Sequence, residues 1–524
     1  MQNIFWVDKV AEDIIKRASA KSKDKIICAS GITPSGIVHA GNFREYLTVA
    51  FVVKAIKDKG KDVEHLHFWD DYDRFRKVPA DVPREFERYI GMPVCFVPDP
   101  WGCHTSYAQH FISLAEEEMR SLGIEAKLIS QASLYQKGYY AEEIKIALQN
   151  RDKIKEILNR FRKEPLPENW YPIQIYCENC KKDTTTIKKV EGEIIFYTCL
   201  NCNFEGTTSP SKGNVKLRWR VDWPARWAKY KVDFEPGGKD HSMPGSSRDT
   251  GSIISEEIFQ YDPPIYFMYN FISLKGEKGK MSGSKGNVIT ISELLKIYEP
   301  EVLRWLYVKT RPEKEFAIPL DDTVIPTYDD FDRYERIYFG EEEEKNERER
   351  MNIIRAYQLG MISLPSKKPF RLQYGFASQI AQLIDFEKEF WKVEELLKKT
   401  GHIKDELSDE DKKAVISRLR RAKYWVENYA PENFKITFSE SRIDIEGKFK
   451  PLLKELADKI KDLEDEDEIL QVTYNTIKEL NLDPKETFSV LYKILIDKEK
   501  GPRFGRLVLL LGKDKVINRF LSLV

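Results

Sequence analysis

The 524 residues of this chain are too many for one hydrophobic core, so we expect three or more domains. Hydrophobic residues make up 41% and charged residues 32%, a balance that excludes disorder over most of the chain. The 85 basic and 85 acidic residues cancel, so global charge does not indicate a nucleic-acid partner, which would have to bind local basic patches.

The amino-terminal segment MQNIFWVDKVAEDIIKR predicts an amphipathic helix that lacks the apolar centre of a secretion signal. No other run reaches the length that spans a membrane. Seven cysteines, an odd number, argue against a disulfide framework. We therefore expect a cytoplasmic protein with no membrane partner.

The amino-terminal part predicts a β-α-β unit, with strands at residues 25–29 and 62–69 and a helix at residues 42–58. The loop between the first strand and the helix, SGITPSGIVHAG, is rich in glycine, proline, serine and threonine. Such a loop lies at the ligand-binding edge of a parallel sheet. The elements expected next are helices near residues 106–123 and 140–162 and a strand at residues 125–130.

Residues 30–42 also combine the features of a phosphate-binding turn. The next helix begins near Asn42, whose side chain could cap it, so free N–H groups and the helix dipole would face an anion. His39 lies in the same turn, where it could donate to a developing phosphate charge. An ordinary strand-to-helix turn with a buried histidine explains this loop equally well. Close backbone approach and hydroxyl donors would come from Gly31, Gly36, Gly41, Thr33 and Ser35.

Residues 275–287, KGEKGKMSGSKGN, contain four lysines, four glycines and two serines. A segment of this composition cannot form a core. It is either a flexible surface linker or a mobile lid that carries ammonium groups onto a polyphosphate.

The strings PSGIVHAGN and KMSGS resemble the HIGH and KMSKS signatures of class I aminoacyl-tRNA synthetases, and their order and separation also match. The resemblance implies that His39 and Asn42 bind ATP and steady its α-phosphate while the amino-acid carboxylate attacks. It implies that Lys280, Ser282 and Ser284 hold the leaving pyrophosphate, with Mg²⁺ accompanying the ATP and no protein nucleophile. Further ATP contacts implied by the two motifs are Thr33, Pro34, Ser35, Gly36, Gly41, Met281 and Lys285.

Two positions depart from these signatures. Asn42 replaces the final histidine of the first motif and can still donate a hydrogen bond. Gly283 stands where the second motif has its second lysine, and Lys285 is expected to substitute for it.

The string Gly238-Lys239-Asp240-His241 resembles the Gly-x-Asp-His turn of the glutamyl and glutaminyl branch of class I synthetases. The resemblance implies that Gly238 and Asp240 belong to the ATP site, where Asp240 holds the ribose. A tight turn with a capping aspartate would explain the same string without a ligand.

Asp70 begins an acidic cluster, DDYD, that resembles the one pairing with the substrate α-ammonium in the glutamyl branch. The arginines with which that branch recognises a side-chain carboxylate correspond to Ala29 and Gly237 here. A buried carboxylate without a cation is costly, so this site should reject glutamate and accept a substrate that brings a positive charge. Trp219 could contact an alkyl chain or ammonium, and Asp222 could supply the counter-charge. The amino-acid site would also include Gly31, Thr33 and His241.

Over almost its whole length the sequence resembles the class I lysyl-tRNA synthetases of archaea and some bacteria. The most specific strings are WDDYDRFRKVP, VKLRWRVDWPARW and PGGKDH. The resemblance implies that L-lysine is activated with ATP and transferred to the terminal ribose of tRNA(Lys). A class I synthetase for another amino acid and a non-catalytic RNA-binding relative are the alternatives.

Two C-x-x-C pairs, Cys177 with Cys180 and Cys199 with Cys202, are separated by eighteen residues. This spacing predicts a zinc ribbon, in which four thiolates hold a structural tetrahedral ion. Free thiols and a redox pair are the alternatives. The other cysteines, expected to be buried or incidental, are Cys28, Cys95 and Cys103.

These features together predict an α/β fold, in which a Rossmann-type parallel sheet is split by an insertion with a zinc ribbon and followed by an all-α anticodon-binding domain. We expect a monomer. The expected divisions are residues 1–95 for the first catalytic half, 96–210 for the insertion with its ribbon at about 174–206, 211–290 for the second half, 291–345 for a stem-contact linker and 346–524 for the helical domain.

Cations beside aromatic residues mark one possible RNA contact in the helical domain. Such a combination suits unpaired RNA bases, which stack on aromatic rings. A solvated helix face explains the same residues equally well. The residues concerned are Arg418, Arg420, Arg421, Lys423, Tyr424 and Trp425, and a second candidate segment is 498–506.

Overall fold

The computed structural model describes residues 5–79, 82–274 and 288–524. The chain divides into two compact units, each built from separate stretches of sequence. The lysine- and glycine-rich segment, residues 275–287, lies outside the described residues. Unit 1 comprises residues 1–294, 300–318 and 343–364, and unit 2 comprises residues 295–299, 319–342 and 365–524.

Unit 1 is built on the parallel sheet that the sequence predicts. β1 (Lys25–Ile32), β2 (Asp62–Trp69) and β3 (Lys127–Ser130) pair in parallel, in the order β1-β2-β3. The crossovers contain α2 (Phe43–Asp58) and α3 (Tyr107–Ser121). β1 ends three residues beyond its predicted bound, and the other four elements lie within two residues of theirs. The agreement arises because short apolar strands alternate with longer amphipathic helices.

The sheet continues on the other side of β1. Ala29 N donates to Phe234 O at 2.8 Å, and residue 234 is bridged in parallel to Ile265. The strands that follow these two residues, β9 (Gly237–Gly238) and β10 (Met268–Tyr269), also pair in parallel. The strand order, with two later strands added beside β1, is that of a doubly wound nucleotide-binding sheet.

Helices cover both faces of this sheet. On one face α2 places Tyr46 edge-on to His67 of β2, with ring centroids 4.7 Å apart. On the other face Phe68 of β2 joins a buried cluster with Trp227 of α7 (Trp219–Tyr230). Successive residues of β2 therefore face opposite helices, as the two-residue period of a strand requires.

The helix expected over residues 140–162 is two helices, α5 (Ala141–Gln149) and α6 (Arg151–Asn159). Asn150 separates them, and its side-chain amide donates to Ile146 O at 2.9 Å. Asparagine competes in this way with the backbone pattern of a helix, which accounts for the break.

The cysteine module between the two halves of the sheet is an antiparallel meander. β5 (Thr185–Glu191), β6 (Ile194–Cys199) and β7 (Glu205–Thr208) pair in chain order. A separate antiparallel pair, β4 (Ile173–Ile175) with β8 (Val215–Leu217), closes the base of the module.

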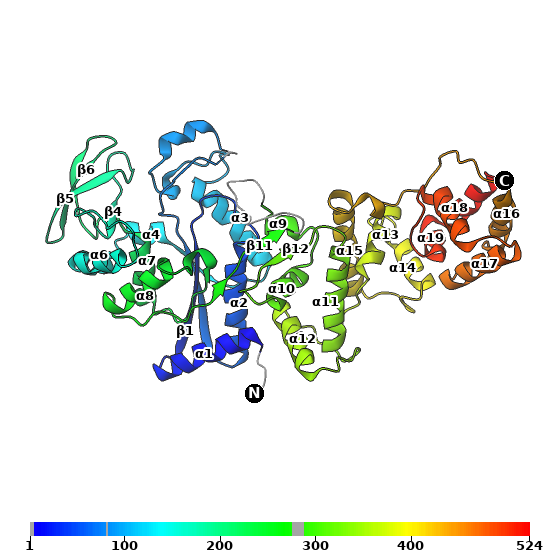
Figure 1. Ribbon diagram of the computed structural model, residues 1–524, viewed down its shortest axis with the longest axis horizontal. Coiled ribbons are helices and arrows are strands. Elements are labelled where there is room, and N and C mark those ends of the chain that lie inside the picture. Colours follow the sequence, from blue (N-terminus) through cyan, green and yellow to red (C-terminus); the bar gives the residue numbers. More distant parts are fainter. Residues whose placement is uncertain (1–4, 80–81, 275–287) are drawn as a thin grey trace. The chain divides into compact units, whose positions relative to one another are not determined.

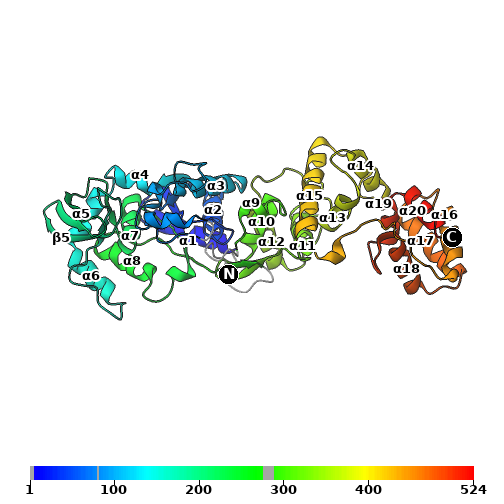
Figure 2. The ribbon, with the colours of Figure 1, turned by 90° about the horizontal axis from the view of Figure 1, so that it is seen from above.

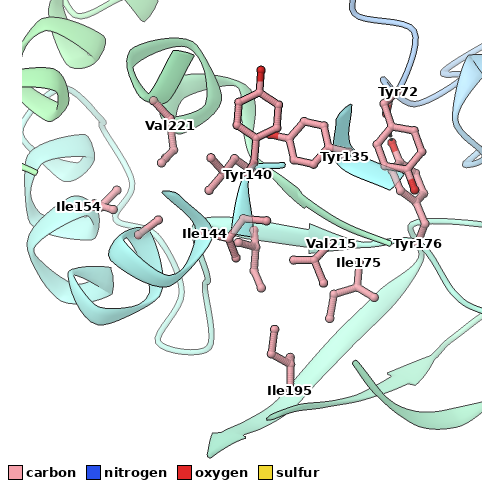
Figure 3. Close-up of a cluster of buried hydrophobic side chains, with 14 of the residues drawn as sticks. Tyr72, Tyr135, Tyr140, Ile144, Ile154, Ile175, Tyr176, Ile195, Val215 and Val221 are labelled. Carbon is pink, nitrogen blue, oxygen red and sulfur yellow. Dashed lines mark hydrogen bonds between the residues drawn. The ribbon is translucent and has the colours of Figure 1, made fainter. Parts of the chain in front are cut away.

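A core of buried tyrosines and aliphatic residues joins this insertion to the sheet (Figure 3). Tyr72, which follows the end of β2, donates its hydroxyl to Gly213 O at 2.8 Å. Tyr176 donates to the carbonyl of Tyr72, also at 2.8 Å, and Tyr135 stacks on Tyr72. The acidic end of β2 is thus fixed by the insertion, because the buried hydroxyls of Tyr72 and Tyr176 both donate to backbone carbonyls.

Two helices from later in the chain also belong to unit 1. α10 (Pro300–Lys309) packs on α12 (Glu347–Gly360), and an added Cβ at Gly360 would lie 2.8 Å from Trp305 Cβ. The expected boundary at residue 346 therefore differs from the structure, which assigns α12 to unit 1 because its apolar face packs on α10. The remaining elements of unit 1 are α1 (Trp6–Ala20), α4 (Gln131–Gln136), α8 (Ser247–Glu257), α9 (Ile291–Leu294), β11 (Ile272–Leu274) and β12 (Phe316–Ile318).

The described part of unit 2 contains helices and no strand (Figures 1 and 2). Several of these helices begin at a residue whose side chain caps them, as where Ser408 accepts from Asp411 N at 3.2 Å. Among the residues that the structure describes, no helix is both long and apolar enough to cross a bilayer. The helices of unit 2 are α11 (Val324–Tyr338), α13 (Tyr374–Leu383), α14 (Phe390–Lys399), α15 (Asp409–Asn428), α16 (Lys450–Lys459), α17 (Glu466–Glu479), α18 (Pro484–Ile496), α19 (Phe504–Leu511) and α20 (Lys513–Leu521).

The prediction that Arg418 and Trp425 offer an RNA-binding surface is wrong. Trp425 is fully buried, and its indole donates to Leu320 O at 2.9 Å. Arg418 is 1% exposed and forms ion pairs with Glu299 at 3.0 Å and Asp332 at 2.9 Å. Both residues lie on the inner face of α15, where they hold the helices of unit 2 together.

The neighbours of Arg418 differ in exposure. Arg420 lies on the outer face of α15 and pairs with Glu387 at 2.6 Å. Lys423 is exposed, whereas Arg421 and Tyr424 are half-buried. In the second candidate segment, Arg506 pairs with the buried Glu466 at 2.8 Å. Any RNA contact by these groups is therefore limited to the exposed side chains.

Candidate active site

A cavity of about 1090 Å³ opens at the carboxyl ends of β1 and β2. This is the edge at which a doubly wound sheet binds its ligands. The turn after β9 and residues near β10 also line the cavity. The predicted site residues that line it are Gly31, Thr33, Ser35, Gly36, His39, Gly41, Asn42, Asp70, Trp219, Gly238, Asp240 and His241.

The turn from His39 to Asn42 forms one wall of the cavity. Asn42 Oδ1 accepts from His39 N at 3.1 Å, and Asn42 N donates to His39 O at 2.8 Å. His39 is 8% exposed and faces the cavity. The turn therefore presents the imidazole to a ligand from a backbone that is already hydrogen-bonded.

The predicted capping role of Asn42 is not observed. Its side chain makes no cap hydrogen bond to α2, because its amide oxygen is taken by His39 N. Glu45 N donates to Asn42 O at 3.1 Å, so the start of α2 is a tight turn whose N–H groups are partly satisfied. Helix-terminal N–H groups thus contribute less to the anion site than the sequence indicates.

Tyrosines from two other helices support the same loop. Tyr107, the first residue of α3, donates its hydroxyl to Ser35 O at 2.9 Å. Tyr307 of α10 donates to Ala40 O at 2.7 Å. These bonds fix carbonyls of the loop, so that its position depends on helices far away in the sequence.

A buried charge network lies beneath the other wall. Arg226 Nη1 is 3.0 Å from Asp70 Oδ1, and Lys216 Nζ is 3.1 Å from Asp73 Oδ1. Asp222 lies between the two cations, 3.3 Å from Lys216 and 3.6 Å from Arg226. Three carboxylates thus share two cations, which leaves the network one negative charge in excess when all five groups are ionised.

The position of Asp222 corrects its predicted role. Its side chain is fully buried and does not line the cavity, and it also accepts a hydrogen bond from Tyr135. Because Lys216 and Arg226 already neutralise this carboxylate, it cannot serve as the direct counter-charge of an amino acid. Asp70 and Asp73 are the members of the network that line the cavity.

The pKa values of these two carboxyls shift in opposite directions. Burial raises the pKa of Asp70, although Arg226 opposes the shift. Burial also acts on Asp73, but the ammonium of Lys216 and the hydroxyl of Thr33, which donates at 2.8 Å, lower its pKa overall. Asp73 is therefore the more firmly ionised of the pair, and Asp70 is the one that gains most from another cation.

Glu45 is a further carboxyl on the cavity wall, supplied by α2. Its Oε1 accepts from Gly31 N at 2.8 Å and its Oε2 accepts from the Tyr269 hydroxyl at 2.6 Å. No lysine or arginine pairs with it among the described residues, and burial raises its pKa to about 8. A ligand cation would remove this desolvation penalty.

The turn after β9 forms the far side of the cavity. Asp240 is exposed, within a single 3-10 turn (Lys239–His241), and His241 lies with its ring centroid 6.0 Å from that of Trp219. An added Cβ at Gly237 would clash with the Tyr266 hydroxyl. A side chain at this position, where the glutamyl branch has an arginine, would therefore require Tyr266 to move.

Sequence patterns alone missed four charged or hydrogen-bonding groups of the site. Glu45 lies within an ordinary amphipathic helix pattern, and Tyr269 follows a proline-rich loop with no motif. Lys216 and Arg226 are in the specific string VKLRWRVDWPARW, where apolar spacing favours a core helix rather than buried cations. The density of charge in that string was the one available signal.

Some predicted contacts fall outside the cavity wall. Pro34 does not line it. The expected pyrophosphate-binding residues belong to the segment that lies outside the described residues. They are Lys280, Met281, Ser282, Ser284 and Lys285.

The four cysteines of the ribbon converge as their spacing predicts. The sulfurs of Cys177 and Cys202 are 3.7 Å apart, and those of Cys180 and Cys199 are 3.6 Å apart. All four lie within 4.8 Å of one another. Sulfurs of a tetrahedral zinc site are separated by about 3.8 Å, so the arrangement can hold such an ion. The pKa shifts within the cluster differ, because a hydrogen bond from Phe204 N lowers the pKa of the Cys202 thiol to about 6, whereas burial raises that of the Cys177 thiol to about 12.

The chain matches known proteins over its whole length. The family model described as tRNA synthetases class I (K) matches residues 4–360. A lysine–tRNA ligase of Thermococcus kodakarensis is 44% identical over 524 residues, which cover 98% of this chain and 99% of the relative. Lysine–tRNA ligases of Methanocaldococcus jannaschii and Borrelia garinii subsp. bavariensis are 42% and 39% identical, each over 99% of this chain and at least 99% of the relative.

Proposed function

Because the chain belongs to the class I lysyl-tRNA synthetase family, we propose that it activates L-lysine with ATP and transfers the lysyl group to tRNA(Lys). The reaction first joins the lysine carboxylate to the α-phosphate of ATP and releases pyrophosphate. The terminal ribose of the tRNA then attacks the lysyl carbonyl, and AMP leaves. Neither step needs a protein nucleophile, so the site acts by positioning and by stabilising charge.

The observation that carries this proposal is the excess of carboxylates over cations at the end of β2 and the start of α2, where Asp70, Asp73, Asp222 and Glu45 lie with Lys216 and Arg226. Lysine brings two ammonium groups and one carboxylate. Asp70 and Asp73 line the cavity with a network that is one cation short, and Glu45 pairs with no lysine or arginine in the part of the chain that the structure describes. A glutamate side chain at this place would face three acidic groups, and the cations beneath them, Lys216 and Arg226, are already paired, which opposes its binding.

We assign the two ammonium groups of lysine to different carboxylates. Asp70, at the end of β2, is the partner of the α-ammonium. Glu45 is the partner of the side-chain ammonium, since its hydrogen-bonded neighbour Tyr269 lies beside the glycines of β9. An added Cβ at Gly238 would lie 3.4 Å from the Tyr269 ring. Gly237, which stands at the arginine position of the glutamyl branch, and the hydrogen bond between Tyr269 and Glu45 thus lie at the same end of the cavity.

ATP would occupy the side of the cavity formed by the His39 turn and the Asp240 turn. His39 and Asn42 would donate to the α-phosphate as charge develops, and Asp240 would accept from the ribose hydroxyls. Lys280, Ser282 and Ser284 would hold the pyrophosphate. Mg²⁺ would accompany the nucleotide and neutralise its phosphate charge.

The four-cysteine cluster would hold a structural Zn²⁺. All four positions are filled by protein sulfur, so no coordination site is left for a substrate. The ribbon is fixed to the sheet by the tyrosine core of Figure 3, which continues to the acidic end of β2. The ion would therefore support the amino-acid site through packing and not through contact.

The acceptor end of the tRNA would reach the same cavity. Arg76 and Lys77 are exposed on its rim, and Arg74 beside them is half-buried. Cations at such a rim suit phosphates of a single-stranded end. The exposed Arg420 and Lys423 of unit 2 remain candidates for a second tRNA contact.

Lysine-dependent exchange of labelled pyrophosphate into ATP, with tRNA(Lys) present, tests this function directly. Each of the twenty amino acids is assayed alone, and lysine alone should support rapid exchange. Rapid exchange with a different amino acid would contradict the proposed specificity for lysine. If no amino acid supported exchange, the protein would instead be a non-catalytic RNA-binding relative. Transfer is then measured as acid-precipitable lysyl-tRNA.

A further inference from the structure

A second cavity, of about 590 Å³, adjoins the first within unit 1. Residues at the end of α6, in the loop that follows it and at the start of α7 line this second cavity. Trp219, the first residue of α7, lines both cavities. We propose that the second cavity binds the unpaired nucleotides that precede the terminal one at the 3′ end of the tRNA, an inference that rests on the proposed function.

Cations without acidic partners surround the second cavity. Its walls carry four exposed cationic side chains, which are Arg162, Lys163, Arg218 and Arg220, and a single carboxylate, that of Glu164. Among the described residues none of the four cations forms an ion pair. Arg220 donates instead to Gly245 O and Arg162 to Glu164 O, both at 3.1 Å. Phosphate groups of a nucleic acid would supply the missing negative charge.

Aromatic rings provide the second feature of a site for single-stranded RNA. Phe161, which lies just beyond the end of α6, is 42% exposed, and Trp170 and Trp219 are half-buried. Bases of unpaired RNA stack on such rings. An acidic protein segment would need the cations alone, so the combination of unpaired cations with accessible rings favours a nucleic acid.

The loop after the β9 turn connects the second cavity to the first. An added Cβ at Gly245 in this loop would lie 3.0 Å from Phe161 Cβ, and Gly245 O is the acceptor of Arg220. His241, at the end of the turn, lies with its ring centroid 6.0 Å from that of Trp219. An RNA strand whose terminal ribose reacts beside the turn can leave past Trp219, which brings the preceding nucleotides to the second cavity.

The start of α7 also favours an anion. The helix begins at the cavity, and its N-cap residue, Arg218, makes no side-chain cap hydrogen bond. The N–H groups and positive dipole end of an uncapped helix start attract phosphate. Asp222, the acidic residue of the first turn, does not line the second cavity and is paired with Lys216 and Arg226.

Shortening the tRNA and a side chain together tests the proposal. The full chain is titrated with labelled tRNA(Lys) and with the same tRNA lacking its last three nucleotides, and the Kd is measured by fluorescence anisotropy. Phe161→Ala should weaken binding of the intact tRNA by about 10- to 100-fold, as expected for one lost stacking contact, and should not affect the shortened tRNA. Phe161→Tyr keeps the ring and should bind both RNAs like wild type. An equal effect of Phe161→Ala on both RNAs, or no effect on either, would overturn the proposal.

Lys163→Gln tests the phosphate contact without loss of a protein contact. The Lys163 side chain is exposed and forms no hydrogen bond or ion pair in the part of the chain that the structure describes. The variant should lower the slope of log K against log salt concentration by about 0.7 for the intact tRNA, the effect of one phosphate contact to a single strand. Lys61→Gln, at an exposed lysine before the amino end of β2, is the matched control and should keep the wild-type slope. Equal slopes for the two variants would contradict the phosphate contact.

These measurements separate the inference from the proposed function. Lysine activation is measured as pyrophosphate exchange in wild type, whereas the comparison of the two RNAs needs no reaction. Exchange with lysine combined with equal effects of Phe161→Ala on both RNAs would overturn the role of the second cavity alone. Without exchange for any amino acid the proposed function fails, yet a selective effect on the intact tRNA would still support binding of its 3′ end in this cavity.

Discussion

The Tyr269 hydroxyl donates to Glu45 Oε2 at 2.6 Å, although the two residues are 224 positions apart in the chain. Tyr269 ends β10, and Glu45 belongs to the first turn of α2. Among the described residues, this half-buried carboxyl on the cavity wall therefore has only neutral hydrogen-bond partners. This pair marks the end of the cavity where we place the side-chain ammonium of lysine.

Glu45→Gln should weaken lysine binding with little change in ATP binding. An ammonium that loses its counter-charge costs about 3 to 5 kcal/mol, so the KM for lysine should rise by about 10²- to 10⁴-fold in pyrophosphate exchange. Glutamine keeps the hydrogen-bonding shape and is neutral like the protonated acid, so the thermal midpoint should not fall. An unchanged lysine KM would remove Glu45 from the amino-acid site.

Lysine binding should release a proton near neutral pH. Burial holds the pKa of Glu45 at about 8 in the free protein, so the carboxyl is mostly protonated at about pH 7. A bound ammonium lowers this pKa, and the proton leaves. Calorimetry in buffers of different ionisation enthalpy should show this release, which vanishes above about pH 9.5 and is smaller in Glu45→Gln. Equal release by wild type and Glu45→Gln would assign the proton to another group.

Arg418→Ala should destabilise unit 2 severely. Removal of this buried guanidinium leaves Glu299 and Asp332 without their cation, which costs about 3 to 5 kcal/mol. Arg420→Ala, on the same helix, removes an exposed pair with Glu387 and should have no measurable effect. Hydrogen exchange of α15 amides in both variants provides the comparison, and similar protection would contradict the buried network.

The same network predicts how unit 2 responds to acid. Although burial opposes them, the guanidinium groups of Arg418 and Arg371 lower the pKa of Glu299 to about 2. A lowered acid pKa stabilises the fold above the unfolded value of about 4.5, and this contribution is lost as the pH falls through about 2. Glu299→Gln should therefore lessen the pH dependence of α15 exchange between these values. Identical pH profiles would show that another carboxyl controls the transition.

His39→Ala should reduce activation without unfolding the protein. The loss of one donor to a developing phosphate charge lowers the rate by about 10²- to 10³-fold. The loop keeps its backbone bonds and the Tyr107 and Tyr307 contacts, so the thermal midpoint should stay nearly the same. A large fall in that midpoint, measured by scanning calorimetry, would mean that His39 is structural.

The sequence by itself determined the local architecture of unit 1. Short apolar strands, a glycine-rich loop and the amphipathic helix after it predict a parallel sheet with a ligand at its edge, because these patterns need only neighbouring residues. The spacing of Cys177, Cys180, Cys199 and Cys202 likewise predicts their convergence, since two tight turns suffice. The lining of one cavity by His39, Asp70 and Asp240 follows from the strand-end positions of their motifs.

Only the tertiary structure decided which distant charges meet. Cations beside aromatic residues on α15 suggested an RNA-binding face, yet Arg418 and Trp425 are directed inward, because the carboxylates of Glu299 and Asp332 come from other parts of unit 2. Asp222 is likewise neutralised by Lys216 and Arg226. A helical period gives the face on which a residue lies, whereas the partner of a buried charge depends on how helices and strands pack.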